Sequence, residues 1–210
     1  LFGTNLISRD VVALANVAPW PTSLQGITVN VGGIDAPIYA VVRAGSSEQV
    51  SFQVPFEVMG RNSVPITLRN FSTASNVINV PVLESQPGLF LYDGVNGAFL
   101  HGMTGQVITP SNPANKGEIV VLFCTGLGLV DNPPATGAPA SPTVLARTKI
   151  APKVKIGGLD ARVTFAGLAP TFIGLYQINA FIPAQVDSGA LDVVVEANGV
   201  TSNIAKLAVR

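Results

Sequence analysis

The sequence predicts an all-β protein of two tandem β-sandwich modules, residues 1–83 and 116–210, joined by a hairpin-like connector at residues 84–115. The first observation is a repeated pattern. Residues 29–36 and residues 154–161 each read as a short alternating strand, a Gly-Gly turn and the start of a second strand. Two turn residues that tolerate positive φ between such runs are typical of a β-hairpin. The second observation is period-two alternation of apolar residues, with turns about every 8–12 residues and no helical periodicity.

The first module is expected to begin within a strand. Residues 1–6 correspond to residues 122–127, which in the second half end a longer strand that begins near Lys116. We therefore expect the first module to be truncated at its N-terminus and the chain to be a fragment of a longer protein. The next stretch, residues 7–25, contains prolines that disfavour helix interiors and central strands. Within it, residues 9–18 could form a short strand or a helical turn.

The remaining strands of the two modules follow in the same order. An alternating run that begins with glutamine and ends with proline occupies residues 49–55 in the first half and residues 177–183 in the second. The final strand pairs are expected at residues 63–69 with 77–83, and 190–197 with 204–209. The dipeptide Asn198-Gly199 between the last two strands is a tight-turn signal.

The connector at residues 84–115 has no counterpart in the first half and is rich in apolar side chains. Leu89, Phe90, Phe99 and Leu100 flank a polar turn at Asp93-Gly94. Exposing all four apolar side chains would leave a patch that soluble monomers rarely tolerate. We therefore expect a hairpin that packs on at least one module and buries Phe90.

Several short motifs resemble known domains. Phe2-Gly3-Thr4-Asn5-Leu6, a strand ending in Gly-Gly-Ile-Asp-Ala and an alternating strand closing in Val-Pro resemble the IPT/TIG immunoglobulin-like domain. The order of Pro-Gly-Leu-Phe, Thr-Pro-Ser-Asn-Pro-Ala, Thr-Gly-Leu-Gly and Gly-Leu-Tyr-Gln-Ile-Asn is similar to the uncharacterised C-terminal domain of many large secreted proteins of Solibacter and related acidobacteria. This resemblance covers essentially all of residues 1–210. It implies two immunoglobulin-like sandwiches and a C-terminal, extracytoplasmic position, and it carries over no catalytic residue.

The composition narrows the classes of function. Apolar residues make up 48% of the chain and charged residues only 11%, a balance common in secreted β-rich modules. Lys plus Arg and Asp plus Glu number 12 each, so there is no excess positive charge with which to bind nucleic acid. No apolar run of about 18 residues is present, so no membrane span is expected. Cys124 is the only cysteine, which excludes an intrachain disulfide and a cysteine-cluster metal site, and its apolar neighbours predict a buried, inert thiol.

No combination of residues predicts a catalytic or metal centre, and no cofactor is expected. His101 is the only histidine, and it is expected on the surface or packed within the hairpin. Asp35 and Asp160 follow the two Gly-Gly turns, where a carboxylate usually accepts local backbone hydrogen bonds. The segment around Asp93 and Asn96 has oxygen donors at short spacing but lacks the further carboxylates of a calcium site. A plain turn is favoured there, and calcium binding is left open.

Three aromatic residues are candidates for ligand binding: Trp20, Tyr92 and Tyr176. Trp20 stands between two prolines, so its ring could be a rigid platform for a sugar, or could equally close one end of the sandwich. The leading hypothesis is a non-catalytic structural or protein-interaction module at the C-terminal end of a longer exported bacterial protein. Its partners would be upstream domains of the same polypeptide and a cell-surface protein or glycan. The alternative is a carbohydrate-binding module, and an enzyme is not expected.

Overall fold

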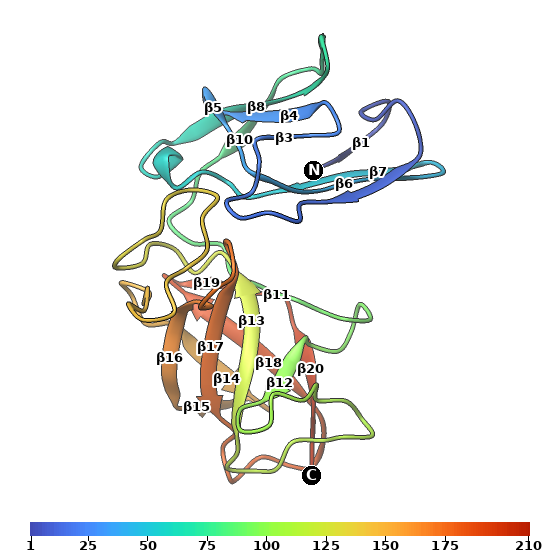
Figure 1. Cartoon of the computed structure of the whole chain (residues 1–210). Helices are drawn as coiled ribbons and strands as arrows, with labels where there is room; N and C mark the ends of the chain where they lie inside the picture. The colour runs from blue at the N-terminus through green and yellow to red at the C-terminus, as the bar shows by residue number, and fades with distance from the viewer. The chain divides into compact units, whose positions relative to one another are not determined.

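The computed structural model describes residues 1–210 and confirms the all-β prediction (Figure 1). It contains β-strands, one short 3₁₀ helix, η1 (Phe56–Val58), and no α-helix. The strands form antiparallel sheets within two compact units. Unit 1 comprises Leu1–Leu83 and Pro134–Pro139, and unit 2 comprises Glu84–Pro133 and Ala140–Arg210. None of the helical structure is long and apolar enough to cross a membrane.

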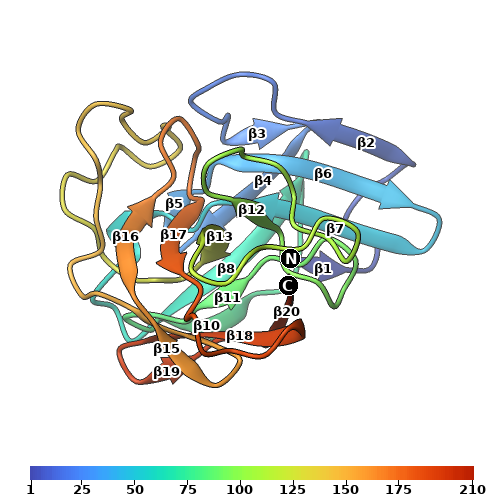
Figure 2. The same cartoon turned by 90° about the horizontal axis from the view of Figure 1, so that it is seen from below.

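Unit 1 contains two sheets, and Figure 2 shows β2, β6 and β7 of the first one side by side. Sheet A has the order β1 (Phe2–Gly3), β7 (Ser47–Phe52), β6 (Ile38–Ala44), β2 (Val11–Leu14). Sheet B has the order β10 (Ile78–Pro81), β8 (Ser63–Asn70), β4 (Ile27–Val31), β3 (Ser23–Leu24), with β5 (Ile34–Asp35) on β4 and β9 (Thr73–Ala74) on β8.

The core of unit 1 is built from β-branched side chains at alternate strand positions. Residues Ile27, Val29 and Val31 of β4 are buried, whereas the residues between them are partly exposed. They belong to one apolar cluster with Val41 of β6 and Val50 of β7, which brings side chains of both sheets together. Branched side chains fit a pleated surface well, so this alternation specifies which face of each strand is buried.

Unit 2 also contains two sheets. Sheet C has the order β11 (Gly88–Leu89), β13 (Ile119–Thr125), β17 (Tyr176–Phe181), β16 (Val163–Leu168), and β12 (Phe99–His101) also pairs with β13. Sheet D has the order β15 (Leu159–Ala161), β14 (Lys153–Ile156), β18 (Gly189–Ala197), β19 (Val200–Thr201), and β20 (Ala205–Val209) also pairs with β18.

The alternation of β13 places Val120, Leu122 and Cys124 in the core of unit 2. The prediction of a buried cysteine is therefore confirmed. Burial raises the pKa of the Cys124 thiol to about 12, so the thiolate that would react as a nucleophile is scarce at neutral pH.

Both expected Gly-Gly hairpins are present. In unit 1, β4 turns into β5 through Gly32 and Gly33, with φ of 61° and 93°. In unit 2, β14 turns into β15 through Gly157 and Gly158, with φ of 58° and 80°. Positive φ at both central residues matches the twist of antiparallel strands and favours glycine, which explains why this dipeptide marks the turns.

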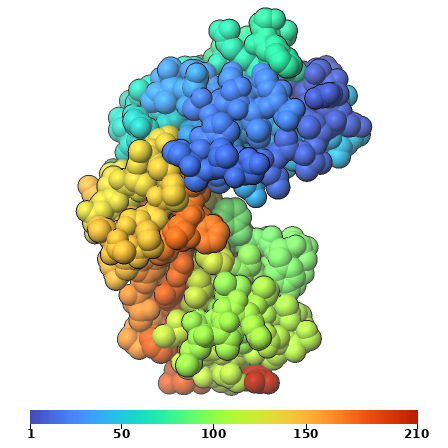
Figure 3. All heavy atoms as spheres, viewed as in Figure 1, coloured from blue at the N-terminus to red at the C-terminus, as the bar shows by residue number.

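The connector at residues 84–115 belongs to unit 2, where it forms part of the surface drawn in green in Figure 3. Its two strands, β11 and β12, do not pair with each other but with successive parts of β13. Only the turn between them is hairpin-like, with a bridge between Leu91 and Gly97. The expectation that the connector packs on a module is met within unit 2.

The expectation that Phe90 is buried is wrong. Phe90 is 45% exposed, whereas Leu89 and Phe99 are buried. Leu89 and Phe90 are consecutive residues next to β13, and consecutive side chains of an extended chain point to opposite faces. Burying Leu89 therefore turns Phe90 outward.

The structure also assigns residues 9–18 and Pro134–Pro139, two stretches of irregular sequence, to unit 1. Residues 9–18 contain the edge strand β2 of sheet A, which settles the alternatives in favour of a short strand. Pro134–Pro139 belongs to unit 1, although the chain on both sides of it belongs to unit 2. Thr136 anchors this segment, since its hydroxyl accepts a hydrogen bond from the amide of Phe56 (3.1 Å) and donates one to Glu57 (2.7 Å).

Candidate functional site

An aromatic pair on unit 1 is the candidate binding site. The rings of Trp20 and Tyr39 have centroids 5.0 Å apart and are tilted by 35°. Trp20 is partly exposed and Tyr39 is exposed, so both rings reach solvent. Neighbouring aromatic faces at the surface can stack on a sugar ring or on an apolar peptide side chain. The sequence-predicted candidate Trp20 is thus part of a two-ring surface.

The backbone on both sides of Trp20 is held in place. The amide of Trp20 donates a hydrogen bond to the carbonyl of Gly137 (2.9 Å), and the carbonyl of Pro21 accepts one from the amide of Ile38 (2.8 Å). The amide of Gly137 in turn donates to the buried side chain of Gln53 (2.7 Å). Ordering the backbone before binding lowers the entropic cost of recognition.

Glycine is required at position 137 because the backbone φ is positive and because there is no room for a side chain. Its φ is +83°, and a Cβ atom there would lie 2.8 Å from the side chain of Pro37. Any larger residue would strain the backbone or displace Pro37. Because Gly137 also binds the Trp20 backbone, the geometry of the aromatic pair depends on a segment more than 100 residues further along the chain.

The other two aromatic candidates, Tyr92 and Tyr176, differ in their exposure to solvent. Tyr92 is exposed beside the turn that follows β11. Tyr176 is buried, and its hydroxyl donates a hydrogen bond to the carbonyl of Gly128 (2.5 Å). Burial raises the pKa of Tyr176 to about 12, with the neighbouring Cys124 adding to the shift. Tyr176 therefore supports the fold, and its prediction as a surface platform is wrong.

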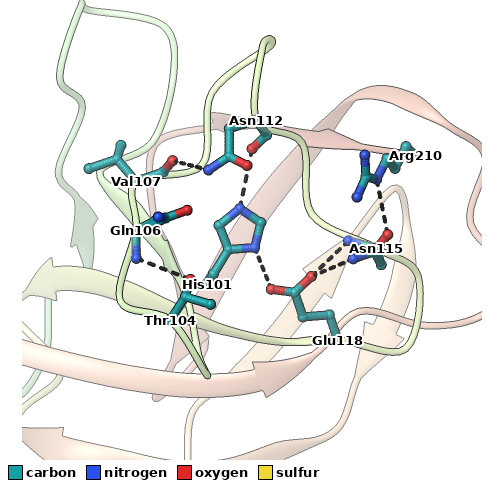
Figure 4. A network of polar contacts seen from close by, with 8 residues as sticks. All are labelled: His101, Thr104, Gln106, Val107, Asn112, Asn115, Glu118 and Arg210. Atoms are coloured by element: carbon teal, nitrogen blue, oxygen red, sulfur yellow. Dashed lines mark hydrogen bonds and ion pairs between the residues drawn. The ribbon is translucent and has the colours of Figure 1, made fainter.

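His101 lies in a polar network inside unit 2 (Figure 4). Its Nδ1 is 2.5 Å from Glu118 Oε1, and its Nε2 is 3.3 Å from the carbonyl oxygen of Asn112. Glu118 Oε2 accepts hydrogen bonds from the backbone and side-chain amides of Asn115, whose oxygen accepts one from Arg210. The network joins β12 to the loop that leads into β13. His101 is buried, so of its two expected positions the structure has the packed one and not the surface one.

Asp35 and Asp160 each bind a side chain of their own Gly-Gly hairpin. Asp35 accepts a hydrogen bond from the side chain of Asn30 (2.8 Å), and Asp160 lies 2.8 Å from the ammonium group of Lys155. Each bond crosses its own hairpin, since these residues are register partners. The two carboxylates bind within their own hairpins as expected, but their partners are side chains and not the backbone amides that the sequence predicted.

The carboxylate of Asp93 accepts hydrogen bonds from residues of its own turn. Asp93 accepts hydrogen bonds from the amide of Val95 (3.0 Å), the amide of Asn96 (2.7 Å) and the side chain of Asn96 (2.6 Å). The Asn96 side chain, followed by these two backbone amides, lowers the pKa of Asp93. No group of three or more His, Cys, Asp and Glu side chains is placed to hold a metal ion.

No family model, no curated protein and no solved structure matches this chain.

Sequence reasoning identified Trp20 but missed Tyr39. The two residues are 19 positions apart, and Tyr39 lies in β6 between the buried residues Ile38 and Ala40. The register of β6 against β7 shifts between Ile38 and Ala40, and such an irregularity redirects a side chain. A bulge has no sequence signal of its own here. The only available hint was an aromatic residue two positions after Pro37.

Proposed function

We propose that units 1 and 2 are two copies of one immunoglobulin-like module of the IPT/TIG kind, and that the chain is a non-catalytic structural or protein-interaction part of a longer exported protein. The observation that carries this proposal is the matching strand register of the two units. Phe2 pairs with Gln49 and Gly3 with Glu48, as Phe123 pairs with Gln177 and Cys124 with Tyr176. The sequence Leu-Phe begins this match in both halves.

A pair of serines supports the same equivalence. The hydroxyl of Ser75 accepts a hydrogen bond from the amide of Leu68 (3.0 Å) and donates one to the carbonyl of Asn76 (2.7 Å). Ser202 makes the same two bonds, with Val195 (3.0 Å) and Asn203 (2.7 Å). Each serine ends a tight turn between the last two long strands of its unit. Two unrelated sandwiches have no reason to repeat this detail.

The outer face of sheet A supports an interaction role. Val12, Val42, Gln49 and Phe2 lie in one row across the four strands of this sheet. Val12 is 72% exposed and Phe2 and Leu14 are also exposed. Side chains of this kind, gathered on one sheet face, are typical of surfaces that contact another protein.

Site-specific photocrosslinking in native host cells tests this role. A photoreactive amino acid at Val12 of the full-length protein should crosslink to one defined protein, and the same group at the exposed Lys153 of sheet D should not. The additional substitution Leu14→Lys should abolish the Val12 crosslink. Equal labelling from both positions would contradict an interaction surface on sheet A. An experimental structure in which β1 with β7 and β13 with β17 are not paired in the same register would contradict the proposal of a repeated module.

The Trp20–Tyr39 pair favours carbohydrate binding as a second candidate function. Two surface rings 5.0 Å apart on a fixed backbone suit stacking against a saccharide. A glycan array probed with the whole chain should then show selective binding that Trp20→Ala and Tyr39→Ala abolish. Phe172→Ala, which removes an exposed aromatic ring in unit 2, is the matched control. An array without selective signal would leave only the interaction role.

A further inference from the structure

The outer face of sheet C in unit 2 carries side chains that the core does not use. Figure 1 shows β16, β17 and β13 of this sheet side by side. Alternate residues of β17 and β13 turn away from the core and are partly exposed: Gln177, Asn179 and Phe181 of β17, and Ile119, Val121 and Phe123 of β13. This face combines aromatic rings, amides and, as described next, two arginines.

Two phenylalanines occupy neighbouring positions on this face. The amide of Phe90 donates a hydrogen bond to the carbonyl of Phe123 (3.1 Å), so the two residues lie beside each other on adjacent strands. Phe90 is 45% exposed and Phe123 is partly exposed, so both rings reach solvent. Exposed rings of this kind can pack against the apolar face of a sugar.

A pair of amides continues the face from Phe123. Gln177 is the register partner of Phe123, and its Nε2 donates a hydrogen bond to Oδ1 of Asn179 (2.8 Å). Oε1 of Gln177 and Nδ2 of Asn179 make no hydrogen bond within the chain. A free acceptor and a free donor therefore lie close together in a fixed orientation. A sugar hydroxyl, which both accepts and donates, can use them together.

Two arginines stack on phenylalanine rings next to these amides. The Cζ atom of Arg162 lies 3.9 Å from the centroid of the Phe181 ring, and that of Arg147 lies 5.0 Å from the centroid of the Phe165 ring. Phe165 is the register partner of Asn179, and Phe181 is two residues beyond it in β17. Stacking on a ring holds the planar guanidinium group in place and leaves its N–H groups free for an anion.

The position of Arg147 depends on a glycine in β16. Gly167 pairs with Gln177 on one side and forms a bridge with Arg147 on the other. A Cβ atom at Gly167 would lie 2.2 Å from the carbonyl oxygen of Ala146. Any other residue would displace the backbone that carries Arg147, so glycine lets this arginine approach the sheet closely.

Neither arginine has an acidic partner. In sheet D, by contrast, every cation of a strand forms an ion pair: Lys153 with Glu196, Lys155 with Asp160, and Lys206 with Asp192. The strands of sheet C contain no Asp or Glu. Asp131 binds the backbone amide of Arg147 (2.5 Å) and forms no ion pair with its guanidinium group. Two uncompensated cations on one sheet face are complementary to an anionic ligand.

We propose that the outer face of sheet C binds a polysaccharide that carries carboxylate groups. The residues of this face are Phe90, Phe123, Gln177, Asn179, Arg147 and Arg162. The guanidinium groups bind carboxylates through paired N–H donors, the amides bind hydroxyls, and the phenylalanines pack against sugar rings. The site lies in unit 2 and uses neither Trp20 nor Tyr39 of unit 1.

The face is less suited to an acidic polypeptide. The backbone of β13 is paired on both sides, with β17 and with β11 and β12, so the face offers no strand edge to which a peptide could add. An extended peptide would need partners for its own N–H and C=O groups, and the face supplies only two amides. A saccharide carries carboxylates and hydroxyls around apolar ring faces, which matches the three kinds of side chain present.

Calorimetric titration of the complete chain with a short oligogalacturonate tests the proposal. We expect saturable binding that weakens as the salt concentration rises. The methyl ester of the same oligosaccharide keeps the sugar rings but not the charge, and it should bind about tenfold or more weakly. Arg162→Gln and Arg147→Gln should each lower the affinity for oligogalacturonate about tenfold or more. Phe90→Ala should lower it about threefold or more.

Arg69→Gln is the matched control, because Arg69 is an exposed arginine of β8 in unit 1 that forms no ion pair. The affinity of this variant should equal that of the unchanged chain, and so should that of Trp20→Ala. Melting curves should show that every variant remains folded. On a glycan array, binding by this face should be confined to acidic glycans and should persist in the Trp20→Ala variant.

Three results would overturn the proposal directly: no saturable binding, equal affinity for oligogalacturonate and its methyl ester, or equal effects of Arg162→Gln and Arg69→Gln. Loss of binding in Trp20→Ala but not in Arg162→Gln would overturn it by moving the ligand to the aromatic pair of unit 1. Equally tight binding of polyglutamate would overturn it in favour of an acidic polypeptide. None of these results would affect the strand registers on which the proposal of a repeated module depends.

Discussion

The carboxylate of Glu118 lies 2.5 Å from Nδ1 of His101, and its second oxygen accepts hydrogen bonds from Asn115. Burial by itself raises the pKa of Glu118, but the hydrogen bonds from Asn115 and His101, together with the charge of His101, hold it below its ordinary value. The folded state therefore favours the ionised carboxylate. Since Arg210 also binds Asn115, Glu118 connects His101 of β12 with Asn115 and, through it, with Arg210.

The first prediction is a pH-dependent contribution of Glu118 to stability. A carboxylate whose pKa is lower in the folded than in the unfolded state stabilises the fold above its unfolded pKa of about 4.3. The contribution is lost as the pH falls through the folded value. We expect Glu118→Gln to lower the free energy of unfolding by about 1.5–3 kcal/mol at pH 7, and by progressively less below about pH 4. Urea unfolding between pH 7 and pH 3 measures the difference.

The control for Glu118 is Glu196→Gln. Glu196 forms an exposed ion pair with Lys153 at 3.0 Å, and such pairs contribute about 0–1 kcal/mol. The difference between wild type and this variant should be small and should vary little with pH. A Glu118→Gln variant that behaves in the same way would contradict the role of the network.

The second prediction concerns Glu48, a buried carboxylate in unit 1. It accepts hydrogen bonds from the backbone amides of Asn5 (3.1 Å), Leu6 (2.5 Å) and Ile7 (2.9 Å). Burial raises its pKa, but these three amides, with Arg43 nearby, leave it lowered. Glu48→Gln replaces an acceptor oxygen by an NH₂ group, so it should destabilise the loop after β1. Amide exchange at Leu6 and Ile7 should become faster, and the melting temperature should fall more at pH 7 than at pH 4.

Tyr176 gives the corresponding measurement in unit 2. It occupies the register position of Glu48, and its hydroxyl binds Gly128 in the equivalent loop. Tyr176→Phe should speed amide exchange in the loop at Gly128. It should leave amide exchange in the loop after β1 unchanged. Identical exchange rates in the Glu48→Gln variant and the wild type would show that the carboxylate does not hold its loop.

The third prediction separates two phenylalanines of the same segment. Phe99 is fully buried, so Phe99→Ala should lower the free energy of unfolding by about 3–5 kcal/mol through lost burial and a cavity. Phe90 is nearly half exposed, so Phe90→Ala should cost about 1 kcal/mol or less. Chemical denaturation of both variants measures the contrast. Equal losses would mean that the side-chain alternation of the segment is not as described.

The fourth prediction uses Trp20, the only tryptophan, as a reporter of the aromatic pair. Gly137→Ala places a methyl group against Pro37 at positive φ, so it should shift the emission of Trp20 and lower the melting temperature. Gly45→Ala is the control, because Gly45 has φ of +60° but no heavy atom near the added Cβ. Gly45→Ala should lower the free energy of unfolding by about 1–2 kcal/mol through backbone strain, without a change in the emission of Trp20. The same emission change in both variants would contradict the link from Gly137 to Trp20.

The sequence by itself determined the features that depend on neighbouring residues. Gly-Gly between alternating runs predicted both hairpins, since only glycine adopts two successive positive φ values without strain. The apolar run around Cys124 predicted a buried thiol, because alternation within one strand decides which side chains turn inward. These signals depend only on neighbouring residues, so they can be interpreted without knowledge of the tertiary structure.

The tertiary structure alone decided the features that depend on partners far apart in the chain. It turned Phe90 outward and Tyr176 inward, because the neighbouring strand, not the residue type, sets the direction of each side chain. It brought Tyr39 beside Trp20 through a register shift, and Gly137 to the Trp20 backbone across more than 100 residues. It also left Ile78 and Val80 exposed, although both are apolar side chains at alternate positions of β10. Whether an apolar side chain is buried depends on a second surface that covers it, and a local pattern contains no information about that surface.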